Sequence, residues 1–226
     1  MTQLTTQLKA LKLSGIIDTL DVRLMEAQQN QLSYSEFVSM LLSDEIEKRN
    51  MNKVARLIRK ANLNPEKTLE NFDFSFNPSI NAALIRELST CRFLERAEGI
   101  FFLGPTGTGK THLAKAICHQ ACRQFFTVAF YSFQQLLQEF QLATIKIQLP
   151  KLLHKLVRLD LLTMDDFGFQ KKIDQQAAEF LHTIVDALDT VLNLLSLTVI
   201  ARLLIGVRYS GSGYCQCYFR PISASI

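Results

Sequence analysis

The sequence lacks the features of secreted and membrane-spanning proteins. It has only five cysteines in 226 residues, an odd number without regular spacing. The first residues do not show the charged and then apolar pattern of a signal peptide. No uninterrupted apolar segment reaches the roughly 18 residues of a membrane-spanning helix, and the closest one, 191–205, carries Asn193 and Arg202. We therefore predict a reduced, cytoplasmic protein that does not bind a membrane.

Cysteine clusters with the spacing of a metal site are also absent from the sequence. Cys215 and Cys217 are two residues apart, but no second pair lies near them, so we give a metal site there little weight. Cys118 and Cys122 fall at i and i+4 and hence on one face of a helix. We expect both to be thiols of the hydrophobic core.

The charges are only mildly unbalanced. There are 25 Lys and Arg against 21 Asp and Glu, which gives a net charge of +4 and a pI of about 8.8. Such an excess permits a nucleic-acid partner without requiring one. Hydrophobic residues make up 48% of the chain, enough for a sizeable core. We expect one α/β domain with a smaller appendage rather than a disordered chain.

The N-terminal region, up to about residue 62, has a helical pattern. Leu8, Leu11 and Leu20 recur at helical intervals. Ser33 and Glu36 have the spacing of a capping box and predict the start of a further helix. We interpret the apolar stripe of that helix as a packing face rather than a binding site. The stripe consists of Phe37, Val38, Leu41, Leu42 and Ile46.

A basic stripe follows on the same predicted helix. Arg49, Lys53, Arg56 and Lys60 fall at i, i+4, i+7 and i+11, so one helix face is cationic. Charge runs are most often solvated faces. Here, however, acidic neighbours lie only at the start of the stripe, which leaves charges that could follow a phosphate backbone. The two interpretations, a solvated face and a DNA-binding face, remain open on the pattern alone.

The segment 104–111 has the pattern of a phosphate-binding loop. It directly follows the apolar run 99–103 and precedes a helix-forming segment, so bound phosphates would lie at a helix N-terminus. Its glycines let successive N–H groups point inward, Lys110 supplies a charge for the β- and γ-phosphates, and Thr111 has the hydroxyl that Mg²⁺ needs. The predicted nucleotide-binding residues are Gly104, Pro105, Thr106, Gly107, Thr108, Gly109, Lys110 and Thr111.

Two adjacent carboxylates complete this site. Asp165 and Asp166 end an apolar run that begins at Leu159. Because parallel strands present their C-terminal ends to one crevice, we expect both side chains beside the phosphate loop. Asp165 would hold Mg²⁺ together with Thr111, and Asp166 would polarise a water for attack on the γ-phosphate, with Lys110 stabilising the charge. Without the loop, a simple turn after a buried strand would be the better interpretation.

The order of segments predicts the domain organisation. Residues 1–65 form a helical N-terminal domain, and 66–98 form a linker with an aromatic, proline-containing connector and a lead-in helix from Ser79 to about Glu98. Residues 99–190 form the nucleotide-binding core, with a second strand at 127–131, an amphipathic helix at 133–143 and a short helix at 152–158. Residues 191–226 follow as a tail.

Several phrases of the sequence resemble the IstB family, ATP-binding helper proteins of insertion sequences that belong to the AAA+ class and are related to the DnaC helicase loader. The resemblance rests on the two site motifs, on the helical N-terminal region and on phrases at 8–12, 68–74, 83–88, 104–114 and 160–168, and it covers about residues 4–188. It implies an α/β fold with a parallel AAA+ P-loop sheet and flanking helices, preceded by a small all-α domain. Asp166 departs from the Glu common at its position, which leaves the hydrolysis rate open.

The resemblance also implies partners and cofactors. ATP and Mg²⁺ would be bound by the core, duplex DNA by the helical domain, and the protein would form a homo-oligomer on DNA and stimulate a transposase. This favours the DNA-binding interpretation of Arg49, Lys53, Arg56 and Lys60. Two alternatives are a helicase loader of DNA replication and a nucleotide-binding remnant that does not hydrolyse ATP.

Past about residue 188 the sequence departs from the family. A family member would show a strand ending in Thr-Ser-Asn, then Pro and Trp, and later an Arg that reaches the neighbouring subunit's γ-phosphate; the chain has none of these and no tryptophan. Codons for residues 213–222 read one base later allow Val-Ile-Ala-Asn-Ala-Ile-Leu-Asp-Arg-Leu. Those for 198–206 read two bases later allow Ser-Asn-Arg-Pro-x-x-Asp-Trp. We therefore hypothesise frameshifts, a truncated sheet without its later strands, and impaired hydrolysis and assembly in this copy; the nucleotide sequence tests the frameshifts.

Overall fold

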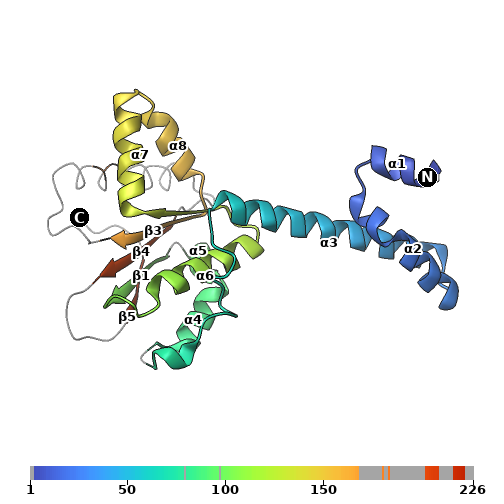
Figure 1. Cartoon of the computed structure of the whole chain (residues 1–226), viewed down its shortest axis with the longest axis horizontal. Helices are drawn as coiled ribbons and strands as arrows, with labels where there is room; N and C mark the ends of the chain where they lie inside the picture. Colours follow the sequence, from blue (N-terminus) through green and yellow to red (C-terminus); the bar gives the residue numbers. More distant parts are fainter. Residues whose placement is uncertain are drawn as a thin grey trace. The chain divides into compact units, whose positions relative to one another are not determined.

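The computed structural model describes residues 3–78, 80–96 and 98–167, Phe180 and Thr183, and the strand backbones 202–208 and 216–221 (Figure 1). The chain forms two compact units, 1–56 and 57–226. The boundary between them lies inside a helix rather than at the expected position after residue 65. The reason is that Leu57, Ile58 and Ala61 already pack against the core of the second unit.

The first unit is helical, as expected. It contains α1 (Gln3–Ala10), α2 (Ser14–Gln29) and most of α3 (Tyr34–Lys60), whose last turn belongs to the second unit. The predicted capping box starts α3: Glu36 Oε2 accepts from the Ser33 backbone N–H at 2.8 Å, and the Glu36 N–H donates to Ser33 Oγ at 3.4 Å. α2 and α3 cross closely at Gly15, whose backbone N–H donates to the buried carboxylate of Glu45 at 2.6 Å.

The apolar stripe of α3 is largely exposed, contrary to its interpretation as a packing face. Val38, Leu42 and Ile46 are 51%, 51% and 59% exposed. The contact between α2 and α3 is made instead by polar groups, because Asp44 accepts hydrogen bonds from Thr19 and Arg23 next to the contact of Gly15 with Glu45. These interactions occupy the face of α3 that turns toward α2.

The second unit is built on a five-stranded sheet in the order β2-β3-β4-β1-β5. Its strands are β1 (Glu98–Gly104), β2 (Val128–Ser132), β3 (Leu161–Phe167), β4 (Arg202–Arg208) and β5 (Gln216–Pro221). The first four run parallel, and β5 pairs antiparallel with β1. The carboxyl ends of β1 and β3 therefore lie at the same edge of the sheet, which is the arrangement the sequence predicts.

Two strands come from the part of the chain assigned to the tail. β4 inserts between β1 and β3, with Ile100 opposite Leu204 on one side and Leu162 opposite Leu203 on the other. The expectation of a sheet without its later strands is therefore wrong for the backbone, because the apolar segment 202–208 supplies a central strand. The remaining tail residues, 191–201, 209–215 and 222–226, lie outside the described residues, as does Cys215. The frameshift hypothesis concerns codons and stays a prediction.

Helices cover both faces of the sheet (Figure 1). One face carries α4 (Ala82–Ser89), α5 (Arg92–Glu95) and α6 (Lys110–Arg123), and the other carries α7 (Phe133–Ile145) and α8 (Leu149–Val157). Side chains alternate between the two cores along the strands: Leu161 of β3 packs with the first group and Leu162 with the second. This alternation follows from the two-residue repeat of a strand whose two faces are both buried.

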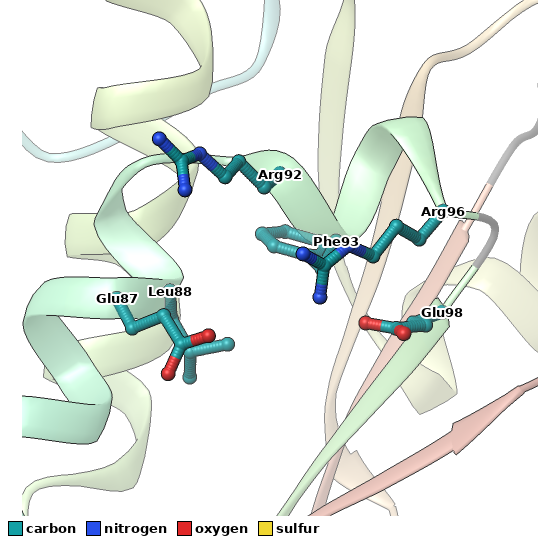
Figure 2. A pocket seen from close by; sticks show the side chains of 6 residues that line it. All are labelled: Glu87, Leu88, Arg92, Phe93, Arg96 and Glu98. Atoms are coloured by element: carbon teal, nitrogen blue, oxygen red, sulfur yellow. The ribbon is translucent and has the colours of Figure 1, made fainter.

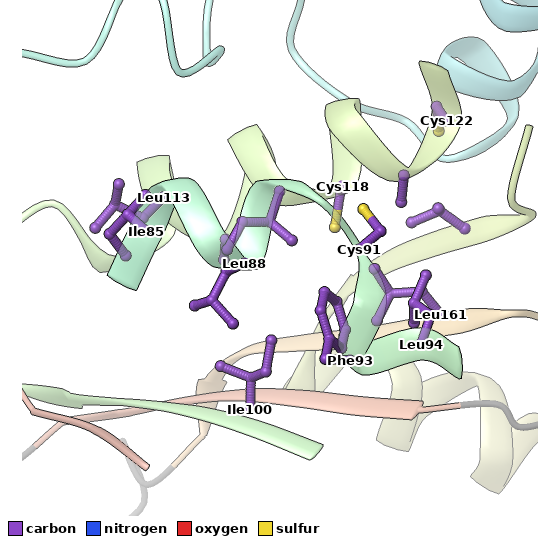
Figure 3. Packing of buried hydrophobic residues seen from close by; sticks show 14 of the residues in the cluster. Ile85, Leu88, Cys91, Phe93, Leu94, Ile100, Leu113, Cys118, Cys122 and Leu161 are labelled. Atoms are coloured by element: carbon purple, nitrogen blue, oxygen red, sulfur yellow. The ribbon is translucent and has the colours of Figure 1, made fainter. Parts of the chain in front are cut away.

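The lead-in segment to β1 differs from the single helix expected over 79–98. A short 3₁₀ turn (Phe74–Phe76) precedes α4, and the chain breaks between α4 and α5 at Cys91, whose φ is 57°. The break lets α4 contribute Ile85 and Leu88 to the core while α5 contributes Phe93, as Figure 3 shows. The expected single helix is therefore two short helices.

Three buried cysteines belong to this core (Figure 3). Cys118 and Cys122 on α6 are fully buried and Cys91 is 1% exposed, which confirms Cys118 and Cys122 as core thiols. Burial raises the pKa of Cys91 and Cys118 to about 12 and that of Cys122 to about 11. The thiols therefore stay protonated at neutral pH and act as small apolar groups.

Among the described residues, no helix is long and apolar enough to cross a membrane.

Candidate nucleotide-binding site

The glycine-rich segment forms a loop between β1 and the N-terminus of α6, as predicted. Gly107 and Gly109 have φ values of 81° and 91°, a backbone conformation that residues with a Cβ rarely adopt. Gly109 is the N-cap residue of α6 and has no side chain that could cap the helix. The first turn of α6 thus has no N-cap side chain, and an anion is a ligand that the positive end of the helix dipole favours.

Lys110 folds its side chain back over the loop. Its ammonium donates to the carbonyl oxygen of Pro105 and, at 3.4 Å, to the hydroxyl of Thr108. The Thr108 hydroxyl itself donates to the Pro105 carbonyl at 2.9 Å. These contacts hold the positive charge next to the N-terminus of α6.

Thr111 and Asp165 meet across the site. The Thr111 hydroxyl donates to Asp165 Oδ1 at 3.2 Å, although the two residues are 54 positions apart in the sequence. Asp165 is only 9% exposed. Both border a cavity of about 290 Å³, which is lined by Thr106, Gly107, Gly109, Lys110, Thr111, His112, Asp165 and Asp166. The cavity thus combines glycine backbone, one ammonium group and two carboxylates.

Asp166 has an unusual backbone for a strand residue. Its φ is 58°, and the pairing of β3 with β4 shifts register between Met164 and Phe167. In a regular strand, neighbouring side chains point to opposite faces of the sheet. An irregularity of this kind re-aims one side chain, so that two neighbours can point the same way. Asp165 and Asp166, although adjacent, therefore both line the same cavity. The left-handed conformation costs on the order of 1–2 kcal/mol, and strain of this kind gathers at functional positions.

The oxygen groups of the site suit magnesium. The hydroxyl of Thr111 and the carboxylate of Asp165 are hard oxygen ligands of the kind that Mg²⁺ prefers, and Mg²⁺ is usually bound by one or two protein groups together with phosphate and water. In the described part of the chain, no group of three or more His, Cys, Asp or Glu could hold a metal by itself. The Thr111 hydroxyl and the Asp165 carboxylate therefore suit a Mg²⁺ ion that is bound together with a polyphosphate.

A family model described as IstB-like ATP binding protein matches residues 6–198 of this chain. The chain belongs to this family. Among curated relatives, an insertion-sequence ATP-binding protein of Mycobacterium tuberculosis is 32% identical over 183 residues, which cover 81% of this chain and 73% of the relative. One of Bacillus thuringiensis is 34% identical, with the same coverage of both chains, and one of Geobacillus stearothermophilus is 35% identical over 70% of this chain and 63% of the relative.

Solved structures agree with the fold of an IstB-like AAA+ protein. AMPPCP-bound DnaA from Aquifex aeolicus superposes with a TM-score of 0.52 and 26% identity, over 64% of this chain and 42% of DnaA. The DnaC helicase loader superposes with a TM-score of 0.51 and 23% identity, over 60% of this chain and 73% of DnaC. The family match ends at residue 198 and so extends beyond the end of the resemblance expected at about 188.

The four basic residues predicted to bind DNA lie on α3 of this IstB-like chain. Arg49, Lys53, Arg56 and Lys60 are all exposed. Arg49 is paired with Glu45, with Nε 2.7 Å from Oε1, so its charge is partly neutralised. The first three residues belong to the first unit and Lys60 to the second.

A second basic surface lies between α7 and α8 and was not among the surfaces predicted from the sequence. It is a groove of about 670 Å³ whose cationic residues are Lys146, Lys151, Lys155 and Arg158, with His154 beside them and Glu139 as its acidic residue. Two exposed isoleucines lie nearby in the sequence, Ile145 as the last residue of α7 and Ile147 in the connection to α8. Lys151, Lys155 and Arg158 fall at i, i+4 and i+7 on α8 and its C-cap, whereas Lys146 directly follows α7. This is the spacing of the α3 stripe, so the sequence did hold a signal for the groove.

A smaller cavity of about 170 Å³ lies at the opposite end of β1 (Figure 2). It is lined by Glu87, Leu88, Arg92, Phe93, Arg96 and Glu98. Figure 2 shows Arg96 extending from α5 alongside Phe93 toward Glu98. Glu98 begins β1 whereas the phosphate loop follows its last residue, Gly104, so this cavity is separate from the nucleotide site. Its two arginines are balanced by two glutamates.

Proposed function

We propose that this IstB-like protein is an ATP-binding AAA+ helper protein that binds DNA and stimulates the transposase of an insertion sequence. The observation that carries the nucleotide part is the contact between Thr111 and Asp165 at the 290 Å³ cavity, beside a glycine loop at the N-terminus of α6. The curated relatives are insertion-sequence ATP-binding proteins by name, and the DnaA structure contains the ATP analogue AMPPCP. Both support ATP as the ligand.

In this proposal each residue of the site has one role. Backbone N–H groups of 104–111 bind the β- and γ-phosphates, and Lys110 neutralises their charge. Thr111 and Asp165 hold Mg²⁺, which when bound offsets the negative charge that develops on the phosphates. Asp166 accepts a proton from the attacking water, whose oxygen forms a bond to the γ-phosphorus while the bond from that phosphorus to the β–γ bridging oxygen breaks.

Hydrolysis by this copy is expected to be slow. The chain lacks the Arg that a family member would extend to the γ-phosphate of the neighbouring subunit, and an arginine finger is worth roughly 10³–10⁵ in rate. The Thr-Ser-Asn expected at the end of the next family strand is missing as well, since β4 ends at Arg208. We therefore expect nucleotide binding to persist while hydrolysis and assembly into a homo-oligomer on DNA are impaired.

Titration of a fluorescent ATP analogue with Mg²⁺ tests nucleotide binding. We expect the intact protein to bind, Lys110→Ala to bind at least about tenfold more weakly, and Asp165→Asn to lose the dependence of binding on Mg²⁺. Asp166→Asn leaves the phosphate contacts intact and should bind like the intact protein. If Lys110→Ala bound as tightly as the intact protein, the loop would not be the phosphate site.

Steady-state ATP hydrolysis, measured with and without duplex DNA, distinguishes an active ATPase from a protein that binds nucleotide without hydrolysing it. Stimulated turnover that is lost in Asp166→Asn would support an active ATPase. Good binding without stimulated turnover would support the non-hydrolysing remnant. Co-purification with a transposase would favour the transposition role, whereas co-purification with a replicative helicase would favour the helicase-loader role.

DNA binding is proposed for two basic surfaces, the α3 stripe and the α7–α8 groove. Both present lysines and arginines that could neutralise phosphates and so make affinity salt-dependent. Replacing Lys53 and Arg56 by Ala should weaken duplex binding and lower the slope of log affinity against log salt by about one for each phosphate that is no longer neutralised. The matched variant, Lys146→Ala with Lys151→Ala, tests the groove in the same assay. Unchanged slopes in both variants would contradict the proposal.

A further inference from the structure

The segment 64–74, which we call the strap, runs along α6 and holds it at three places. The carbonyl oxygen of Asn64 accepts from His119 at 2.9 Å, that of Thr68 accepts from His112 at 2.8 Å, and Glu70 pairs with Arg123. The strap begins just after α3 and belongs entirely to the second unit. In the sequence, most of this segment belongs to the predicted linker 66–98, and 68–74 is one of the phrases that resemble the family; no contact with the phosphate loop is predicted for it.

Phe72 of the strap touches the phosphate loop itself. A Cβ at Gly109 would lie 2.8 Å from Phe72 Cε2 and 3.0 Å from Cζ, so the ring rests directly against the backbone of Gly109. The ring also packs edge-on against His112, with centroids 5.1 Å apart and planes at 80°. A Cβ at Gly107 would have no neighbouring atom within 4 Å among the described residues. Phe72 therefore supports the loop at its last residue before α6.

We propose that Phe72 is a positioning residue for phosphate binding, an inference that rests on the proposed nucleotide-binding function. Gly109 immediately precedes Lys110 and Thr111, and its φ of 91° sets the direction in which the first N–H groups of α6 point. The Phe72 ring limits the movement of that backbone. Thr68 fixes the orientation of His112, which lines the same cavity. A loop held in its binding conformation loses less entropy when the phosphates bind.

Phe74 is the matched control for this role. It lies 4.9 Å from Phe72 between ring centroids, packs against the same core and is also half-buried, but it is not among the atoms nearest to Gly109. Phe72→Ala and Phe74→Ala should therefore lower thermal stability to a similar degree. Only Phe72→Ala should also weaken phosphate binding.

Binding of two probes separates positioning from a contact between Phe72 and the base. The probes are a fluorescent ATP analogue and inorganic tripolyphosphate, both with Mg²⁺; the second has no base and is measured by calorimetry. We expect Phe72→Ala to bind both probes about tenfold or more weakly, with Phe74→Ala close to the intact protein. Phe72→Tyr keeps the aromatic face but adds an oxygen on Cζ, one of the two ring atoms against Gly109. We expect this variant to bind both probes more weakly as well.

Each other result decides against the inference. If Phe72→Ala lost binding of the ATP analogue but kept tripolyphosphate binding, Phe72 would contact the base. If Phe72→Ala and Phe74→Ala lost equal amounts of binding affinity, the effect would come from general packing. Unchanged binding of both probes by Phe72→Ala would also overturn the inference. If Phe72→Ala does not fold, Phe72→Tyr decides by the same criteria. Failure of the intact protein to bind either probe would refute the proposed function itself, and is thereby distinguished from failure of the positioning role.

Discussion

Gly15 sets the distance between α2 and α3 in the first unit. A Cβ at this position would lie 2.7 Å from Glu45 Cα, 2.8 Å from the Asp44 carbonyl oxygen and 2.9 Å from Lys48 Cβ. Two of these atoms belong to the α3 backbone and cannot rotate away. We predict that Gly15→Ala destabilises the protein by about 1–3 kcal/mol, measured as a shift of the denaturation midpoint in urea. Ser14→Ala, at the exposed preceding residue, is the control and should change stability little; an unshifted midpoint in Gly15→Ala would contradict the close crossing.

Asp44 makes the stability of the first unit depend on pH. Hydrogen bonds from Arg23 and then Thr19 lower the pKa of Asp44 from 3.8 to about 2. A carboxylate with a lowered pKa in the folded state stabilises the fold above its unfolded pKa, and this contribution is lost as the pH falls. We predict that Asp44→Asn is less stable than the intact protein at neutral pH. The difference should shrink between about pH 4 and pH 2 in acid titrations followed by circular dichroism.

The control for this prediction is Asp21→Asn, at an exposed aspartate of α2. It should follow the acid titration of the intact protein. A constant difference between Asp44→Asn and the intact protein over the whole range would mean that the pair with Arg23 does not drive the pH dependence.

The connection between α7 and α8 contains a residue with a strained backbone conformation, Ile147. Ile147 has a φ of 55° and is 89% exposed, and the next N–H, of Gln148, donates back to the Ala143 carbonyl at 2.7 Å. This is the helix-end position at which Gly or Asn is usual, because a β-branched side chain is crowded there. We predict that Ile147→Asn stabilises the protein by about 1 kcal/mol. Thermal denaturation should show a higher midpoint for Ile147→Asn than for the control Ile145→Asn, which changes an exposed isoleucine inside α7; equal midpoints would argue against the strain.

Elements marked by local signals could be predicted from the sequence. The order of strand, glycine loop and helix gave β1, the phosphate loop and α6, and parallel geometry predicted that Asp165 and Thr111 come together. The Ser33 capping box likewise marked the start of α3. Each of these depends on neighbouring residues or on a rule that holds for any parallel sheet.

Features that depend on tertiary contacts could not be predicted. Cys91 interrupts the helix expected over 79–98 by adopting a left-handed conformation, although neither Gly nor Pro marks the break. The irregular backbone at Asp166 depends on how β3 pairs with β4, and the contact of Phe72 with Gly109 joins residues that the sequence keeps far apart. Secondary-structure propensities of single residues predict none of these three features, because each is imposed by packing partners that are distant in the chain.

At the scale of the whole molecule, the nucleotide site depends on a strand from the sequence tail. Thr111 lies in α6, which follows β1, and Asp165 lies near the carboxyl end of β3. These two strands are not neighbours, because β4 lies between them and pairs with both. Among the strands that the structure describes, β5 pairs with β1 alone, on the side away from β4. The contact between Thr111 and Asp165 therefore needs β4, whereas β5 only extends the sheet at its edge.

Two shortened chains test this dependence. A chain ending at residue 190 loses β4, so β1 and β3 are left with unpaired backbone groups and apolar edges. We predict that it loses cooperative unfolding and Mg²⁺-dependent binding of the ATP analogue. A chain ending at residue 212 keeps β4 but lacks β5, and it should retain binding because β1 and β3 remain joined. Binding by the chain ending at 190 at the affinity of the intact protein would show that β4 does not hold the two halves of the site together.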